Sequence, residues 1–234
     1  MPARRIHLFL LLSAASVLVW SGVRPAGRLN WLMETSPAII GGAILVATYR
    51  RFRFTTPTYL AAWILAIILM IGGHYTYARV PIGDCVRDAF GLSRNHFDRF
   101  GHFFQGVVPA LFARELLRRT SPLRPGRWVF TVCLCVALAI SAAYELFEWR
   151  YAVAFGGARA DDFLGSQGDV WDAQKDMAMA LLGAIFAMVF VSGWQERRMP
   201  EAAASSAAPV ERSVNAASTS GGPPQSNLRG EVGK

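Results

Sequence analysis

The sequence has few charged residues and very little cysteine. Only 17% of its 234 residues are Asp, Glu, Lys or Arg, against about a quarter in a typical soluble domain. Its hydrophobic residues, 53% of the chain, come in long runs that are typical of membrane spans. Three cysteines are too few for a disulfide framework. Cys133 and Cys135 lie two residues apart in an apolar segment, so we expect them to point to different sides of a helix.

The sequence also lacks the short motifs of many enzyme classes. It contains no HExxH, ExxH or CxxC motif, no nucleophile elbow, no Walker loop and no dinucleotide fingerprint. The formal net charge of +8 does not indicate nucleic-acid binding, because the Arg residues flank apolar segments instead of forming a basic stripe on a polar helix. We therefore expect a protein in contact with a lipid bilayer, with no nucleic-acid partner.

Six segments qualify as membrane spans, so the sequence predicts an all-α polytopic bundle of about six transmembrane helices. They are residues 6–23, 37–49, 58–78, 100–117, 128–151 and 172–194. The first follows Arg4 and Arg5 and precedes no clear A-x-A site, which favours a retained signal anchor. The fourth is amphipathic, and a sliding hydropathy window would rank it last.

The second span is short and rich in small residues. We expect that it can extend backwards through Leu32 and Met33, and that Gly41 and Gly42 allow a neighbouring helix to approach closely. In the last span, Gly183 and Ala187 form a small-xxx-small step of the same kind.

Arginine placement predicts the orientation. Dense clusters in short loops mark the cytoplasmic side: Arg4 and Arg5, then Arg50, Arg51 and Arg53, then Arg118, Arg119, Arg124 and Arg127, then Arg197 and Arg198. Both termini should therefore be cytoplasmic, with loops 79–99 and 152–171 outside. Residues 1–198 form the predicted bundle. Residues 199–234, rich in Ala, Ser, Gly and Pro, form a predicted disordered cytoplasmic tail.

This orientation gathers ionisable residues at the outer ends of the spans, where desolvating them is costly. They are His74, His96 and His102 with Asp84, Asp88, Asp98, Glu145, Glu148, Asp161, Asp162, Asp169, Asp172 and Asp176. The sequence predicts a polar site there. It indicates neither a substrate nor an oligomeric state.

In the fourth span, Asp98, His102 and Gln105 share one helical face. Asp98 can hold one ring nitrogen of His102 and leave the other for a metal or a substrate proton. An alternative is an interfacial polar face that lines water, with Asp98 at the positive start of the helix. Asn95 or Ser93 is the expected cap of this helix.

In the fifth span, Glu145 and Glu148 share a face with Ser141. A carboxylate facing lipid at mid-membrane costs roughly 2.5–3.5 kcal/mol. These acids must therefore face the bundle or lie near the interface, which Trp149 and Arg150 mark. We favour a specific role for both.

The sixth span begins with Asp169, Asp172 and Asp176 on one face. Helix capping and the helix dipole explain the first two but not Asp176, which lies two turns in. The preceding loop, DDFLGSQGD, has the composition of a tight turn. An alternative role for these acids is an ion-pair network that closes the outer surface, with partners Arg79, Arg94 and Arg99.

A divalent metal is a further hypothesis, which no sequence motif supports. The ligand types that such an ion takes in a helical bundle are present in His102, Glu145, Glu148 and Asp176.

The words RNHFDRFGHFFQG, AYELFEW and FLGSQGDVWDAQKDM resemble the YjdF family of bacterial inner-membrane proteins over most of residues 37–194. The resemblance implies a multi-pass inner-membrane protein and no particular activity. A looser similarity to VanZ-like membrane proteins rests on His102, Glu145, Glu148, Asp172 or Asp176, and Gly183. In that pattern an Asn follows the Asp, and Gln174 does not match it.

We hypothesise that an outward-facing polar site binds or modifies a lipid or lipid-linked head group. If it is catalytic, His102 would be the general base, oriented by Asp98, with Glu145 or Glu148 as acid or metal ligand. Ligand contacts are expected from His74, Arg99, Gln105, Asp169, Asp172 and Asp176. The alternatives are a proton-coupled transporter of a small solute and a non-catalytic membrane scaffold.

Overall fold

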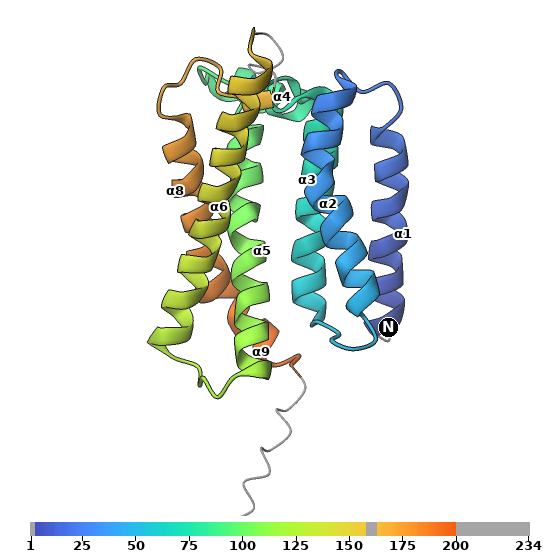
Figure 1. Cartoon of the computed structure of the whole chain (residues 1–234), viewed down its shortest axis with the longest axis vertical. Coiled ribbons are helices and arrows are strands. Elements are labelled where there is room, and N and C mark those ends of the chain that lie inside the picture. Colours follow the sequence, from blue (N-terminus) through green and yellow to red (C-terminus); the bar gives the residue numbers. More distant parts are fainter. Residues whose placement is uncertain (1–2, 158–162, 200–234) are drawn as a thin grey trace, which may run out of the picture. The chain divides into compact units, whose positions relative to one another are not determined.

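The computed structural model describes residues 3–157 and 163–199, and the regular elements in that part of the chain are all helical (Figure 1). The long helices are α1 (Ala3–Ser21), α2 (Arg28–Thr48), α3 (Thr56–Tyr75), α5 (Phe97–Thr120), α6 (Arg127–Phe155) and α8 (Asp172–Phe186). The shorter elements are η1 (Tyr77–Arg79), α4 (Pro81–Phe90), η2 (Ala187–Val191) and α9 (Ser192–Glu196). The all-α prediction is confirmed. The predicted tail, apart from Met199, lies outside the described residues, as do Asp161 and Asp162.

Within the described residues, five helical segments are long and apolar enough to cross a membrane: α1, α2, α3, α6 and the stretch Asp172–Glu196. The 24-residue α5 is too polar to join them, but its charged residues Asp98, Arg114 and Glu115 are buried. α5 packs against α3, α6 and α8, so that protein rather than lipid surrounds these charges. A sixth span formed by α5 stays a prediction.

The helices of residues 1–200 pack in two sets that α3 and α5 join. α3 contacts α1 and α2, whereas α5, α6 and α8 contact one another (Figure 1). The apolar core of the second set contains small buried side chains, among them Ala110, Cys133, Ala137 and Ala184. We call the end of this unit that carries α4 and residues 163–171 the α4 end, at the top of Figure 1.

α5 and α8 approach so closely that their backbones touch. A Cβ atom on Gly106 would overlap the carbonyl oxygen of Ala180, and one on Gly183 would overlap that of Phe103. The close approach predicted for Gly183 is thus confirmed, and Gly106 is its unpredicted counterpart. No neighbour within the described part of the chain uses the space expected at Gly41 and Gly42, because a Cβ on either would meet nothing within 4 Å.

Several predicted boundaries need correction. α2 begins at Arg28, nine residues before the predicted 37, because Pro37 lies inside the helix and does not start it. Membrane helices tolerate such a proline. α6 continues four residues beyond the predicted 151, to Phe155. The last span is not uniformly α-helical, since Ala187–Val191 is a π-helix, a feature that is frequent near functional sites.

The segment 79–99, predicted as a loop, contains helix α4. Pro81 occupies its first turn, and Gly91 ends it in the left-handed conformation at φ 61°, which is the usual placement of these two residues. α3 ends earlier than predicted, at Tyr75, because Thr76 takes φ 66° and turns the chain into η1. This turn brings Tyr77 into the interior, where 6% of its surface is exposed.

The two neighbouring cysteines of α6 diverge as predicted. Cys133 is fully buried in the core and Cys135 is exposed. Cys85 on α4 is also exposed.

Candidate functional site

The first turns of α5 carry a histidine that lies between two carboxylates. His102 Nε2 lies 3.5 Å from Asp98 Oδ1, and His102 Nδ1 lies 3.6 Å from Glu145 Oε1 on α6. Both Asp98 and His102 are buried, with 6% and 5% of their surface exposed. The structure therefore brings Asp98 and His102 together, and it adds Glu145 on the other edge of the ring.

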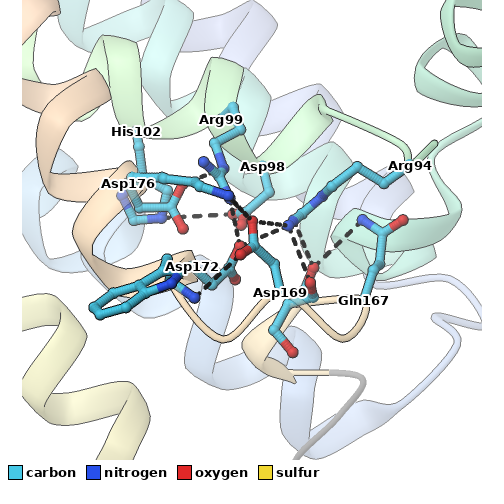
Figure 2. A network of polar contacts seen from close by, with 12 residues as sticks. Arg94, Asp98, Arg99, His102, Gln167, Asp169, Asp172 and Asp176 are labelled. Carbon is cyan, nitrogen blue, oxygen red and sulfur yellow. Dashed lines mark hydrogen bonds and ion pairs between the residues drawn. The ribbon is translucent and has the colours of Figure 1, made fainter. Parts of the chain in front are cut away.

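The helix contact described above explains why Asp176 joins this group. Gly106 lies one turn after His102 on α5, and Ala180 lies one turn after Asp176 on α8. Because Gly106 packs on the Ala180 backbone, the two preceding turns face each other. One ligand atom each from Asp98, His102 and Asp176 lie within 4.8 Å of one another, and all three residues are buried (Figure 2).

A cavity of about 150 Å³ lies beside His102. Its polar walls come from four elements and include three carboxylates, Glu34, Asp98 and Glu148. Its other lining residues are Pro37, Leu65, Leu69, Tyr77, Gly101, His102, Gln105, Pro109, Ile140 and Tyr144. The predicted residues Asp98, His102, Gln105 and Glu148 therefore meet at one cavity.

An ion-pair network covers the α4 end next to this cavity. Arg94 and Arg99 both reach Asp172 Oδ1, at 2.7 and 2.6 Å, and Arg99 also lies 3.2 Å from Asp169 (Figure 2). Lys175 contacts Asp169 at 2.6 Å. The predicted outer network is thus present in the structure for Arg94 and Arg99, which clamp the start of α8 to the start of α5.

The loop before α8 is fixed to the α4–α5 connection by hydrogen bonds. Gln167 and the Asn95 backbone exchange two of them, at 3.0 and 2.8 Å. Arg94 donates to the carbonyl oxygens of Gly165 and Ser166. The N-cap of α5 is His96, so the cap expected at Asn95 or Ser93 is wrong. The Asn95 side chain nevertheless accepts from the Phe97 amide at the start of α5. The tight turn predicted from the sequence of this loop therefore packs over the polar cluster.

Charged groups outside the spans show how strongly this network holds its ions. The hydrogen bond from Lys175 and that from the Trp171 backbone N–H lower the pKa of Asp169 from 3.8 to about 2.

In the interior, burial and then the charge of Glu34 raise the pKa of Tyr77 well above its ordinary value. Tyr77 therefore keeps its proton and can donate it in a hydrogen bond within the cavity.

Several buried polar atoms without a hydrogen-bond partner gather around His102, although Tyr59, Thr76, Arg94, Arg99 and Arg118 also carry one each within the described residues. Within the described residues, His102 Nδ1, Gln105 Oε1, Ser141 Oγ, Glu145 Oε1 and Asp176 Oδ1 are buried without a hydrogen-bond partner. Glu115, at the other end of α5, is fully buried and accepts from the Thr55 amide, the hydroxyls of Thr55 and Thr58, and Arg119. Native interiors rarely leave such atoms unpaired, so Glu115 is structural, and the His102 cluster needs another explanation.

Two lining residues of the cavity were missed by sequence reasoning. Glu34 on α2 is 3% exposed and accepts a hydrogen bond from the Tyr144 hydroxyl at 3.2 Å. Its signal was available, because an acid in a spanning helix is itself a site indicator, but Glu34 fell in the possible extension of the predicted span 37–49 and not in the span itself. Tyr77 gave no such signal, since its position follows from the turn at Thr76.

Other predicted residues lie elsewhere. His74 stacks on Trp20 and its Nδ1 lies 2.9 Å from the Ser21 carbonyl oxygen, so it joins α3 to α1 and is not among the cavity-lining residues described. Arg150 lies near the Trp149 ring, 5.7 Å from its centroid. The ligand-binding roles of His74, Asp169, Asp172 and Arg99 stay predictions.

Comparison with known proteins gives the family. Residues 6–197 match the family described as "Predicted membrane protein (DUF2238)". The chain is 50% identical over 188 residues to the Escherichia coli (strain K12) protein named "Inner membrane protein YjdF", an alignment that covers 80% of this chain and 90% of that protein. No solved structure matches. The resemblance drawn from the sequence is confirmed, and the chain belongs to the DUF2238 family of membrane proteins, which includes an inner-membrane relative.

Proposed function

We propose that this chain binds the polar head of a lipid or lipid-linked molecule in the cavity beside His102, with the α4 end facing the outside of the inner membrane. The observation that carries the proposal is the two-part lining of the cavity. Glu34, Asp98 and Glu148 gather near the α4 end. Ile140, eight residues from Glu148, extends the lining about 12 Å toward the middle of the span. A molecule with a polar head and an apolar tail matches both parts.

The cavity also reaches the lipid-facing surface. Ile140 on α6 and Pro37 on α2 both line it and are both exposed, Ile140 by 45%. We propose that a lipid enters the cavity sideways from the bilayer between these two residues. Asp98 and His102, whose carboxylate and ring lie 3.5 Å apart, line the part of the cavity that would receive the head group.

The arrangement supports ligand binding over the two alternatives. A scaffold requires the acids to be fully paired, whereas a cavity lies beside His102 and Glu148. Proton-coupled transport requires a polar path along the bundle. On α5 such a path is interrupted between His102 and the Glu115 cluster by the buried apolar residues Val107, Ala110 and Leu111.

The test is lipid analysis of the purified chain by native mass spectrometry. We expect a lipid species enriched over the bulk membrane, lost in Ile140→Trp, which fills the apolar section, and in Glu148→Gln. Leu138→Trp is the matched control, because Leu138 is an exposed residue of the same helix. Retention of the same lipid by folded Ile140→Trp would overturn the proposal.

A further inference from the structure

We propose that Asp98, His102 and Asp176 bind a divalent transition-metal ion, with Glu145 orienting the histidine. The three residues come from α5 and α8 and present ligand atoms within 4.8 Å of one another. The ion would lie between these two helices, next to the cavity but in a place that does not depend on a bound lipid.

Buried polar atoms around this point have no hydrogen-bond partner within the described residues. In the part of the chain that the structure describes, Asp176 Oδ1 and His102 Nδ1 lack hydrogen bonds, although 3% and 6% of their side chains are exposed. An acidic cluster alone would be weak evidence. Buried polar atoms without partners are rare. A cation would pair Asp176 Oδ1 directly, and binding it through Nε2 would leave the His102 Nδ1–H to donate to Glu145.

The histidine ring lies between two carboxylates, one near each nitrogen. His102 Nε2 faces Asp98, while Nδ1 lies 3.6 Å from Glu145 Oε1. A metal-ligating histidine usually donates its second ring N–H to a carboxylate, which fixes the tautomer and the ring orientation. Glu145 stands where that carboxylate is needed, and Nε2 is left to bind the ion.

The carboxylates around His102 outnumber the positive charges that they contact. Asp98, Glu145 and Asp176 lie close together, and Arg99 supplies a positive charge at 2.9 Å from Asp176. That charge is shared, because Arg99 Nη2 is bound to Asp172 and Asp169. Arg99 Nε and Asp176 Oδ1 form an ion pair, but within the described residues neither atom has a hydrogen-bond partner. Their contact therefore lacks hydrogen-bond alignment. A divalent ion would balance the remaining negative charge of these carboxylates.

The ligand set selects the class of metal. One imidazole nitrogen with two carboxylates suits first-row ions such as Mn²⁺ and Zn²⁺ better than Ca²⁺ or Mg²⁺, which prefer oxygen ligands alone. The cavity provides the path of entry, because Asp98 and His102 line it.

The experiment uses the full chain in detergent, freed of metal by chelation and then equilibrated with Mn²⁺ or Zn²⁺. We expect about one ion per chain by elemental analysis and a higher unfolding midpoint when the ion is present. Asp176→Asn should weaken binding about tenfold or more, and Glu145→Gln about tenfold. Asp88→Asn, in which the altered side chain is 69% exposed on α4, is the control and should bind normally.

A spectroscopic readout keeps the test decisive if Asp176→Asn does not fold. Bound Mn²⁺ should show electron-spin-echo modulation from a coordinated nitrogen, and His102→Gln should lose it. A wild-type chain that binds neither ion, or binding that Asp88→Asn weakens as much as Asp176→Asn does, would overturn the metal site. Either result would leave the lipid proposal standing, because that proposal is tested by Ile140→Trp without metal.

Discussion

Gly106 on α5 lies against the carbonyl oxygen of Ala180 on α8 with no room for a Cβ atom between them. One turn away along each helix are His102 and Asp176. The contact between a glycine and a backbone oxygen thus sets the separation of two buried ionisable side chains. The polar site depends on helix packing as well as on its own residues.

Gly106→Ala should therefore destabilise the fold. The new methyl group would meet backbone atoms that cannot rotate away, and overpacking of this kind costs about 1–3 kcal/mol or more. Gly41→Ala is the matched control, because its methyl group would enter open space. Thermal unfolding in detergent measures both, and equal midpoints for the two variants would contradict the described α5–α8 contact.

The Arg94 guanidinium should hold the loop before α8 in place. Arg94→Met removes bonds to Gly165, Ser166 and Asp172, and a charged hydrogen bond contributes about 1.5–3 kcal/mol. We expect amide exchange in residues 163–171 to accelerate about tenfold or more. Arg150→Met, which alters an exposed arginine outside the network, should leave exchange there unchanged. Unchanged exchange in Arg94→Met would argue against the clamp.

Acid should weaken the contribution of Asp169. Its folded-state pKa of about 2 lies below the ordinary 3.8, so the unfolded chain binds the proton more tightly and acid favours unfolding. The stabilisation is present above about pH 4 and is lost as the pH falls toward about 2. Asp169→Asn should lower the unfolding midpoint near neutral pH, and the difference from wild type should shrink in acid. A difference that stays constant with pH would contradict the ion-pair role.

The proposed orientation can be read from a native cysteine. Cys85 is exposed on α4, Cys133 is buried, and Cys135 is exposed but lies within the candidate membrane span Arg127–Phe155. If the α4 end faces outward, a membrane-impermeant thiol reagent should label Cys85 in intact cells with a permeabilised outer membrane. Cys85→Ser should abolish that label. Labelling that requires disruption of the inner membrane would reverse the orientation.

The sequence predicted the helices and the shared face of Asp98 and His102 because both follow from local periodicity. It also predicted that Arg94 and Arg99 are partners of the acids before α8. This long-range pairing could be predicted because the arginines and the acids lie at span ends that the predicted orientation places on the same side of the membrane.

The cavity itself was not predictable. Glu34 was not predicted as a site residue. Asn30 and Glu34 lower the hydropathy of the first turns of α2, so the predicted bounds of the span, 37–49, excluded them. Tyr77 enters the interior through a positive φ at Thr76, which no local pattern indicated. α4 is strongly amphipathic and short, so a search for apolar runs passed over it. The place of Tyr77 depends on tertiary contacts that a single sequence does not display, whereas the acid Glu34 within a spanning helix was a readable signal.

The central claim is that the cavity beside His102 holds a polar head group, and a density map of the protein in lipid nanodiscs tests it most directly. The account predicts a density that contacts His102 and Glu148 and continues past Ile140 into the bilayer between α2 and α6. A well-resolved map in which the cavity is collapsed, with Glu34 and Glu148 turned away from His102, would contradict it.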